Sequence, residues 1–162
     1  MAGGEPAVGL VEAIYITAAA AEPLRAVATA DAVAGAGLAG DRYQLGVGTY
    51  SGKPGPDRHV TLIAAEALDA VAAEGWPLAP GEHRRNIVVR GLDVDALSGR
   101  TITIGAVTLR GIRPCPPCGH LERVTGRPGL RAVMEGRSGL RTEVVTGGTI
   151  ALGDRVTVPT AD

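Results

Sequence analysis

The stretch that decides the fold class is Thr101-Ile102-Thr103-Ile104-Gly105-Ala106-Val107-Thr108-Leu109. Its first four residues alternate polar and apolar side chains, as a strand with one buried face does. Gly105 interrupts the alternation, and apolar sequence resumes up to Ile112. The stretch therefore predicts a β-hairpin, with strands at residues 101–104 and 106–112.

Further short strands are predicted on both sides of this hairpin, because 24 glycines and 11 prolines divide the chain at close intervals. One clear amphipathic helix is predicted at Ala65–Glu74, and it ends at Gly75 and Pro77. The pattern predicts a mainly β fold with some α structure: a closed or partly open β-barrel with a few short helices. The expected strands are Val8–Thr17, Leu24–Val33, His59–Ile63, Asn86–Val89, Glu143–Val145 and Arg155–Val158, with residues 149–154 as a connection and short helices at Leu121–Val124 and Leu130–Met134.

Composition excludes several classes of protein. The 162 residues suit one domain, expected at 8–158 between short termini at 1–7 and 159–162. A net charge of −1 and 2% aromatic residues predict no nucleic-acid partner. No apolar stretch approaches the length of a membrane span, so no membrane partner is expected. The N-terminus lacks signal-peptide features. A disulfide between two cysteines this close in sequence would stabilise a secreted fold poorly, so we expect a cytoplasmic protein.

The only two cysteines lie in the loop Arg113-Pro114-Cys115-Pro116-Pro117-Cys118-Gly119-His120. The thiolate is the reactive form of cysteine, and nearby Arg113, His120 and Arg123 would lower a thiol pKa. The spacing fits a redox pair, a zinc knuckle, or one reactive or metal-binding cysteine next to a second cysteine without a chemical role. Both cysteines could also be inert. A zinc-stabilised scaffold would need four ligands, which the two cysteines and the three histidines of the chain would have to provide.

Arginine makes up 15 of the 16 basic residues, and it binds carboxylate or phosphate through two parallel hydrogen bonds. The segment Gly37–Tyr43 combines Arg42 with glycines whose backbone could form an anion nest; the alternative is an ordinary turn with a surface ion pair. Arg84-Arg85-Asn86 precedes an apolar strand. Adjacent strand residues face opposite sides, so we expect only one arginine, Arg85, to enter a site.

Six segments of the chain, taken in their sequence order, resemble the MOSC domain, which is named after the C-terminal domain of molybdenum-cofactor sulfurases. The resemblance covers residues 8–158 and implies a β-barrel with one functional cysteine at its mouth. In the family pattern Pro-Cys-x-x-Leu, the matching cysteine is Cys118. The segments are Gly37–Tyr43, Arg58–Ile63, Arg84–Val89, Leu97–Arg100, Pro117–Leu121, and Gly139–Arg141 followed by Gly148–Val156.

The resemblance implies binding of molybdenum cofactor (molybdopterin), with Cys118 as the catalytic residue and metal ligand, in a small reductase of N-hydroxylated compounds. The alternative is a non-catalytic carrier that holds sulfur as a Cys118 persulfide for metal–sulfur cofactor assembly. The cofactor is anionic, so binding it needs arginines, free backbone N–H groups and a soft metal ligand. The expected cofactor-binding residues are Gly40, Asp41, Arg42, Arg58, His59, Arg85, Asn86, Cys115 and His120.

The chain lacks the aminotransferase-like domain of the sulfurases and the N-terminal barrel extension of larger oxidoreductases, so we expect a stand-alone domain. It would be a molybdenum-dependent oxidoreductase or a sulfur transferase. Its expected partners are a small-molecule or cofactor ligand and either a sulfur donor or an electron-transfer protein.

Overall fold

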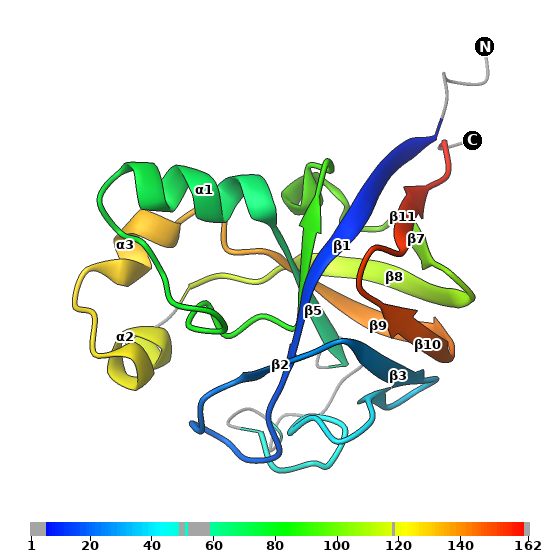
Figure 1. Cartoon of the computed structure of the whole chain (residues 1–162), viewed down its shortest axis with the longest axis horizontal. Helices are drawn as coiled ribbons and strands as arrows, with labels where there is room; N and C mark the ends of the chain where they lie inside the picture. The colour runs from blue at the N-terminus through cyan, green and yellow to red at the C-terminus, as the bar shows by residue number, and fades with distance from the viewer. Residues whose placement is uncertain (1–5, 49–50, 52–58, 118, 161–162) are drawn as a thin grey trace.

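The computed structural model describes residues 6–48, 51, 59–117 and 119–160 (Figure 1). Its elements are short, as the many turn residues predict. The helices are α1 (Ala65–Ala73), α2 (Gly119–Thr125) and α3 (Leu130–Met134), with a 3-10 turn at Val94–Ala96. The strands are β1 (Ala7–Ile16), β2 (Arg25–Val27), β3 (Thr29–Val33), β4 (Gly37–Leu38), β5 (Val60–Ala64), β6 (Ile87–Arg90), β7 (Thr101–Ile104), β8 (Val107–Pro114), β9 (Leu140–Thr146), β10 (Gly148–Ala151) and β11 (Arg155–Val158).

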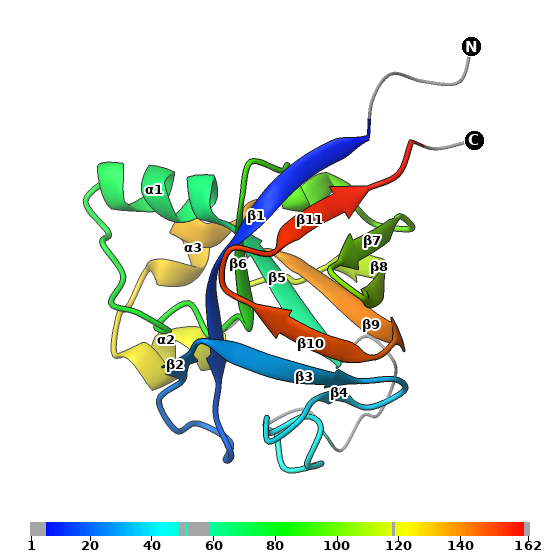
Figure 2. The same cartoon turned by 45° about the vertical axis from the view of Figure 1, so that its right-hand side comes forward.

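Seven strands close into a barrel in the order β11-β7-β8-β9-β5-β6-β1, and pairing of β1 with β11 completes the circle. The predicted hairpin is confirmed as β7 and β8, with Ile104 opposite Val107 across the turn. Among the described strands, β5 and β6 are the one parallel pair, because α1 connects them as a crossover. A smaller sheet, β10-β3-β4, lies at one side of the barrel (Figure 2).

The core has two parts. Isoleucine, leucine and valine fill the barrel interior, and residues such as Ile14, Ile102 and Leu140 have no exposed surface. A second cluster lies between the barrel wall and the helices, where Val71 of α1, Leu121 of α2 and Met134 of α3 are buried. The three helices therefore gather on one side of the barrel (Figure 1). Among the described residues, no helix has the length and apolar character needed to cross a bilayer.

Two expectations about strands were wrong. The single strand expected at Leu24–Val33 is two strands, because β2 pairs with β1 whereas β3 pairs with β10. The change of partner occurs at Ala28, whose carbonyl accepts a hydrogen bond from the Leu152 N–H (3.1 Å). The first three residues of the connection expected at 149–154 belong to β10, whose pairing partner lies more than a hundred residues earlier in the chain.

Candidate functional site

Arg85 is held at one end of the barrel by the segment that precedes β9. Its Nε donates to the carbonyl of Ser138 (2.7 Å) and its Nη2 donates to the Ser138 hydroxyl (2.8 Å). No described residue accepts a hydrogen bond from Nη1, and the side chain is only half-buried. The guanidinium is thus fixed along one edge, which leaves its other edge able to bind an anion.

Arg42 and Asp41 form a buried ion pair beside this group. Asp41 has no exposed surface and accepts hydrogen bonds from Arg42 Nη1 (3.2 Å) and from the Thr17 N–H (3.2 Å). Arg42 lies over the ring of Tyr43, 4.8 Å from its centroid, and its Nη2 donates to the Arg84 carbonyl (3.4 Å). The Asp41 carboxylate therefore positions Arg42 against the segment that carries Arg85.

The Gly37–Tyr43 segment uses most of its backbone N–H groups within the protein. The Gly40 N–H donates to Gln44 Oε1 (3.0 Å), and the N–H groups of Ala39 and Asp41 donate to backbone carbonyls at 2.8 and 3.0 Å. Gly37 has φ +126°, and a Cβ there would lie 2.7 Å from the His59 carbonyl. Glycine is required at this position for close packing, so the arginines rather than an amide nest are the groups suited to an anion.

Arg84, the other arginine of the pair, is more deeply buried, and its contacts differ from those of Arg85. Both residues precede β6, so strand alternation does not apply to them, and Arg84 has the left-handed φ of +65°. Its side chain is 6% exposed and its Nη1 donates to the Glu22 carbonyl. Burial, followed by the charge of Arg42, lowers the pKa of Arg84 to about 10. Arg84 also lines a pocket of about 290 Å³ between the 21–24 and 79–82 segments and α2.

Asn86 and His59 are engaged with the protein backbone. Asn86 is 2% exposed; its Oδ1 accepts from the Thr61 N–H (3.0 Å) and its Nδ2 donates to the Tyr15 carbonyl (3.1 Å). It therefore ties the start of β6 to both neighbouring strands. His59 precedes β5, and its Nδ1 accepts from the Val144 N–H (3.1 Å). His59 thus links the segment before β5 to β9.

Cys115 follows β8 and is 6% exposed. Its N–H donates to the Gly139 carbonyl (2.8 Å), and the Gly139 N–H donates to Asp95 Oδ1 (3.0 Å). Burial, the largest effect, raises the pKa of Asp95. Because Gly139 follows Ser138 in the chain, one short segment joins the cysteine loop to Arg85.

The structure therefore brings most of the described candidates together, through hydrogen bonds that run from Asp41 to Arg42, to the 84–86 segment, to 138–139 and to Cys115. Arg58 and Cys118 lie outside the described residues, and His120 falls in α2. Among the described residues, no group of three or more histidine, cysteine or acidic side chains could hold a metal. The roles expected of Cys118 and His120 stay predictions.

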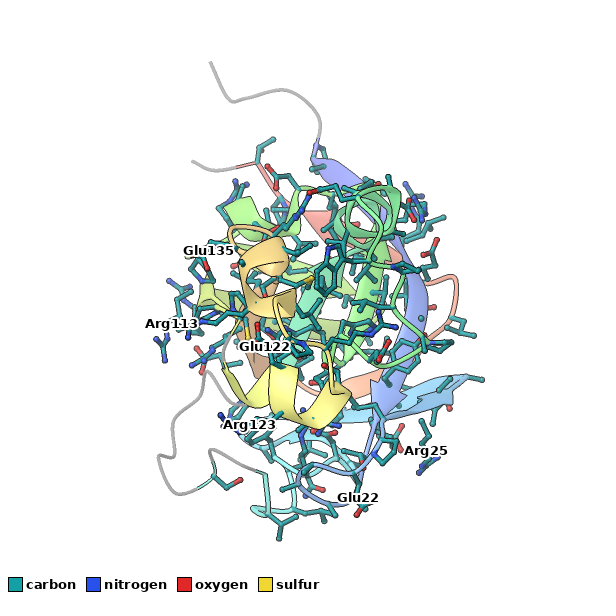
Figure 3. The ribbon with its side chains drawn as sticks, turned by 90° about the vertical axis from the view of Figure 1, so that its left-hand side faces the viewer. Glu22, Arg25, Arg113, Glu122, Arg123 and Glu135 are labelled. Carbon is teal, nitrogen blue, oxygen red and sulfur yellow. The ribbon has the colours of Figure 1, made fainter. Side chains whose placement is uncertain are left out.

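Sequence reasoning missed Ser138 and Asp95. Ser138 directly precedes the Gly139–Arg141 segment of the family resemblance, and this position could have indicated that it belongs to the site. No feature of the sequence around Asp95 indicated a role for that residue. Arg141 was noted only as part of that segment, yet in the β8–β9 register it lies opposite Arg113. Arg113 and Arg123 project on the same side of the molecule (Figure 3). More arginines therefore lie near the cysteine loop than the three, Arg42, Arg58 and Arg85, that were expected to bind the cofactor.

His83 provides a test of the packing next to Arg85. Its Nδ1 accepts from the Arg85 N–H (2.9 Å); burial, followed by the charge of Arg85, lowers the pKa of His83 from 6.5 to about 3. The unfolded chain takes up this proton near pH 6.5, so His83 lowers stability as the pH falls below 6.5. Between pH 7.5 and pH 5 we expect its protonation to cost about 2 kcal/mol of unfolding free energy.

The measurement is urea unfolding at both pH values for the wild type and for His83→Asn. Asparagine keeps an acceptor for the Arg85 N–H but does not titrate. The variant should lose about 2 kcal/mol less than the wild type on acidification. Equal losses in the two proteins would show that another group is responsible.

The fold and site define a small closed-barrel protein with helices on one side and buried arginines at one end. Residues 49–157 match the family model described as MOSC domain. That match covers more than half of the chain, which therefore belongs to the MOSC domain family. No curated protein matches the chain significantly.

Solved structures share this fold. YuaD from Bacillus subtilis superimposes with a TM-score of 0.80 at 19% identity, covering 97% of this chain and 98% of that chain. YiiM from Geobacillus stearothermophilus has a TM-score of 0.70 at 17% identity, covering 93% and 74%. YiiM from Escherichia coli has a TM-score of 0.68 at 18% identity, covering 99% and 72%. At these identities the likeness concerns the fold alone.

Proposed function

We propose that this MOSC protein binds molybdenum cofactor and acts as a small reductase of N-hydroxylated compounds, with Cys118 as the metal ligand. The observation that carries the proposal is a set of three contacts between neighbouring segments. Arg42 donates to the Arg84 carbonyl, and Arg85 donates to Ser138. The N–H of Cys115, three residues before Cys118, donates to the Gly139 carbonyl. These contacts support the proposal, because they link the segment of Arg85 to the start of the cysteine loop at Cys115. Membership of the MOSC family supports the choice of cofactor.

The described residues fit an anionic ligand. Arg85 is fixed by two hydrogen bonds to Ser138 and keeps Nη1 unused by any described residue. Phosphate recognition benefits from such a prearranged guanidinium, because no side-chain entropy remains to be lost at that group. The cofactor phosphate would be held by Arg85, while Arg42, whose charge is paired with Asp41, would support the segment that carries Arg85 through the Arg84 carbonyl. When bound, the cofactor would provide the redox centre of the reaction.

A second candidate function is sulfur transfer through a Cys118 persulfide. It requires a reactive thiolate in a positively charged pocket but no bound metal. A positively charged surrounding would favour the reactive thiolate in either case. Persulfide labelling of the purified protein distinguishes this function from the first.

The experiment that tests the leading proposal is elemental and pterin analysis of protein produced in a host that synthesises molybdenum cofactor. We expect molybdenum and pterin in equal amounts, approaching one of each per chain. Protein with neither, but with a labelled persulfide, would transfer the assignment to sulfur carriage. Stoichiometric zinc would instead support a zinc-stabilised scaffold.

Replacing Arg85 by Lys tests anion recognition at this residue. Lysine keeps the charge but cannot make two parallel hydrogen bonds or reach Ser138 in the same way. Loss of a charge-assisted hydrogen bond costs about 1.5–3 kcal/mol, so we expect a ten- to hundredfold weaker retention of cofactor. The measurement is cofactor occupancy after identical purification.

The matched control is Arg155→Lys, an exposed position on β11 that makes none of these contacts. It should retain the cofactor as the wild type does. The midpoint of thermal unfolding is measured for both variants, so that loss of fold is separated from loss of binding. Full occupancy in a folded Arg85→Lys protein would exclude phosphate recognition by Arg85.

A further inference from the structure

A second pocket, of about 280 Å³, lies on the outer wall of the barrel under α1. Its floor is formed by β1 and β6, and the segment 77–83 closes another side. An enclosed apolar cavity of about 150 Å³ can hold benzene. The pocket is therefore large enough for a single ring with a substituent or for two fused rings.

Two polar side chains, the buried His83 and Tyr15, line this pocket, and each has a polar atom that no described residue bonds to. His83 is 3% exposed, and because its Nδ1 accepts the Arg85 N–H, the proton of the neutral ring lies on Nε2. Among the described residues, none accepts a hydrogen bond from Nε2 and none bonds to the hydroxyl of Tyr15, which is 9% exposed. The two rings are in edge contact, with centroids 5.2 Å apart.

The buried Nε2–H of His83 needs an explanation, because the large majority of buried polar groups in proteins are hydrogen-bonded. Tyr15 lines the same pocket and brings a hydroxyl to it. Two such polar side chains in one pocket are the arrangement expected of a site whose hydrogen-bond partner is a ligand. Together they offer one certain donor, Nε2–H, and a hydroxyl that can donate or accept.

The remaining walls define the rest of the ligand. Leu68 and Ala72 of α1, with Pro77 and Leu78, provide an apolar surface for a flat body. The rim carries two carboxylates, Glu12 and Asp69, which share one cation: Arg90 contacts them at 2.6 and 3.0 Å.

One cation between two carboxylates leaves the rim with a net negative charge, which disfavours an anionic ligand. Burial, followed by the charge of Glu12, raises the pKa of Tyr15, so its hydroxyl is protonated at neutral pH.

We propose that this pocket binds a small, uncharged aromatic amide or lactam, whose carbonyl accepts hydrogen bonds from His83 Nε2 and the Tyr15 hydroxyl. The aromatic body packs on the apolar wall, and the carboxylate rim excludes acids of the same shape. The proposal does not depend on the molybdenum-cofactor assignment, because none of its evidence involves the cysteine loop.

Benzamide is the probe, and benzoate is its matched control, because the two share a ring and differ in charge. Each is titrated into the full-length protein at pH 7.5 and followed by amide chemical shifts. For benzamide we expect saturable binding with a Kd on the order of 1 mM, typical of a ligand this small. The shifts should centre on residues 13–15, 68–72 and 77–83, and benzoate should bind at least about tenfold more weakly.

Two variants test the hydrogen bonds. Tyr15→Phe removes a hydroxyl that makes no described protein contact, so the folded protein should be at least as stable as the wild type, yet benzamide should bind about three- to tenfold more weakly. His83→Asn keeps the acceptor for the Arg85 N–H but removes the Nε2 donor, and it should weaken binding by about tenfold. Tyr43→Phe is the control and should bind benzamide as the wild type does.

The proposal is overturned if benzoate binds as tightly as benzamide, if the shifts map outside this pocket, or if Tyr15→Phe binds benzamide unchanged. Should His83→Asn fail to fold, Tyr15→Phe decides the question alone. Failure here would leave the molybdenum and pterin content unaffected, so the two proposals fail independently.

Discussion

Replacing Cys118 by Ser is expected to remove bound molybdenum, or the persulfide if sulfur carriage is the function. Both chemistries require the thiolate, which a serine hydroxyl cannot replace as a soft ligand or sulfur acceptor. Loss of groups that merely support a metal ligand costs about 10–100-fold in affinity, so loss of the ligand itself should cost at least that. The measurement is molybdenum, pterin and persulfide content per chain.

Cys115→Ser is the matched control. Cys115 is buried, and its backbone N–H donates to the Gly139 carbonyl, a bond that serine would keep. The substitution should therefore act on the site mainly by changing side-chain packing. We expect it to lower cofactor or sulfur content by less than about tenfold, in line with the cost of one altered packing contact. Equal, complete loss in both variants would contradict a single working cysteine and favour a paired redox or zinc site.

Gly139→Ala is expected to destabilise the fold more than any other single-methyl change near the site. Gly139 has φ +104°, and an added Cβ would lie 2.2 Å from the Leu62 carbonyl oxygen on the neighbouring strand. The left-handed backbone costs about 1–2 kcal/mol and the steric overlap about 1–3 kcal/mol more, so we expect a loss of roughly 3 kcal/mol or more. Urea unfolding measures it.

Gly136→Ala is the matched control, because it has the same sign of φ (+77°) and nothing within 4 Å of the added Cβ. It should lose only the backbone contribution of about 1–2 kcal/mol. Equal stability of the two variants would contradict the expected steric overlap between a Cβ at residue 139 and the Leu62 carbonyl oxygen of β5. Because Gly139 also bonds to Cys115 and Asp95, a folded Gly139→Ala protein should in addition bind cofactor less well.

Local patterns predicted the elements whose partners are close in sequence. The β7–β8 hairpin followed from alternation around Gly105, and α3 was expected at its observed bounds, Leu130–Met134. The prediction was wrong where pairing is distant. β10 has only four residues and pairs with β3, and neither segment carries a local signal for the other. Short strands form because a partner is present, and a partner far along the chain leaves no local trace.

In the candidate site, too, the features that depend on local sequence were predicted and those that depend on distant contacts were not. The glycines and arginines of the 37–43 and 84–86 segments indicated an anion site, and the structure joins these segments through Arg42 and the Arg84 carbonyl. Strand alternation does not apply to Arg84, because it lies before β6 in the left-handed region of backbone conformation, and its side chain is buried. Ser138 and Asp95 were missed, since their importance arises only from the residues they meet across the barrel.

By itself, the sequence determined a mainly β chain with short helices, one cysteine loop, an almost exclusive use of arginine as the cation, and membership of a family recognisable from six ordered segments. These properties depend on side-chain chemistry and on spacing within a few residues. The tertiary structure alone decided which N–H groups of the glycine loop are used, that Arg85 is fixed by Ser138, and that Tyr15 and His83 line one pocket with polar atoms to which no described residue bonds. Each of those depends on contacts between distant segments, which barrel closure creates and local sequence does not encode.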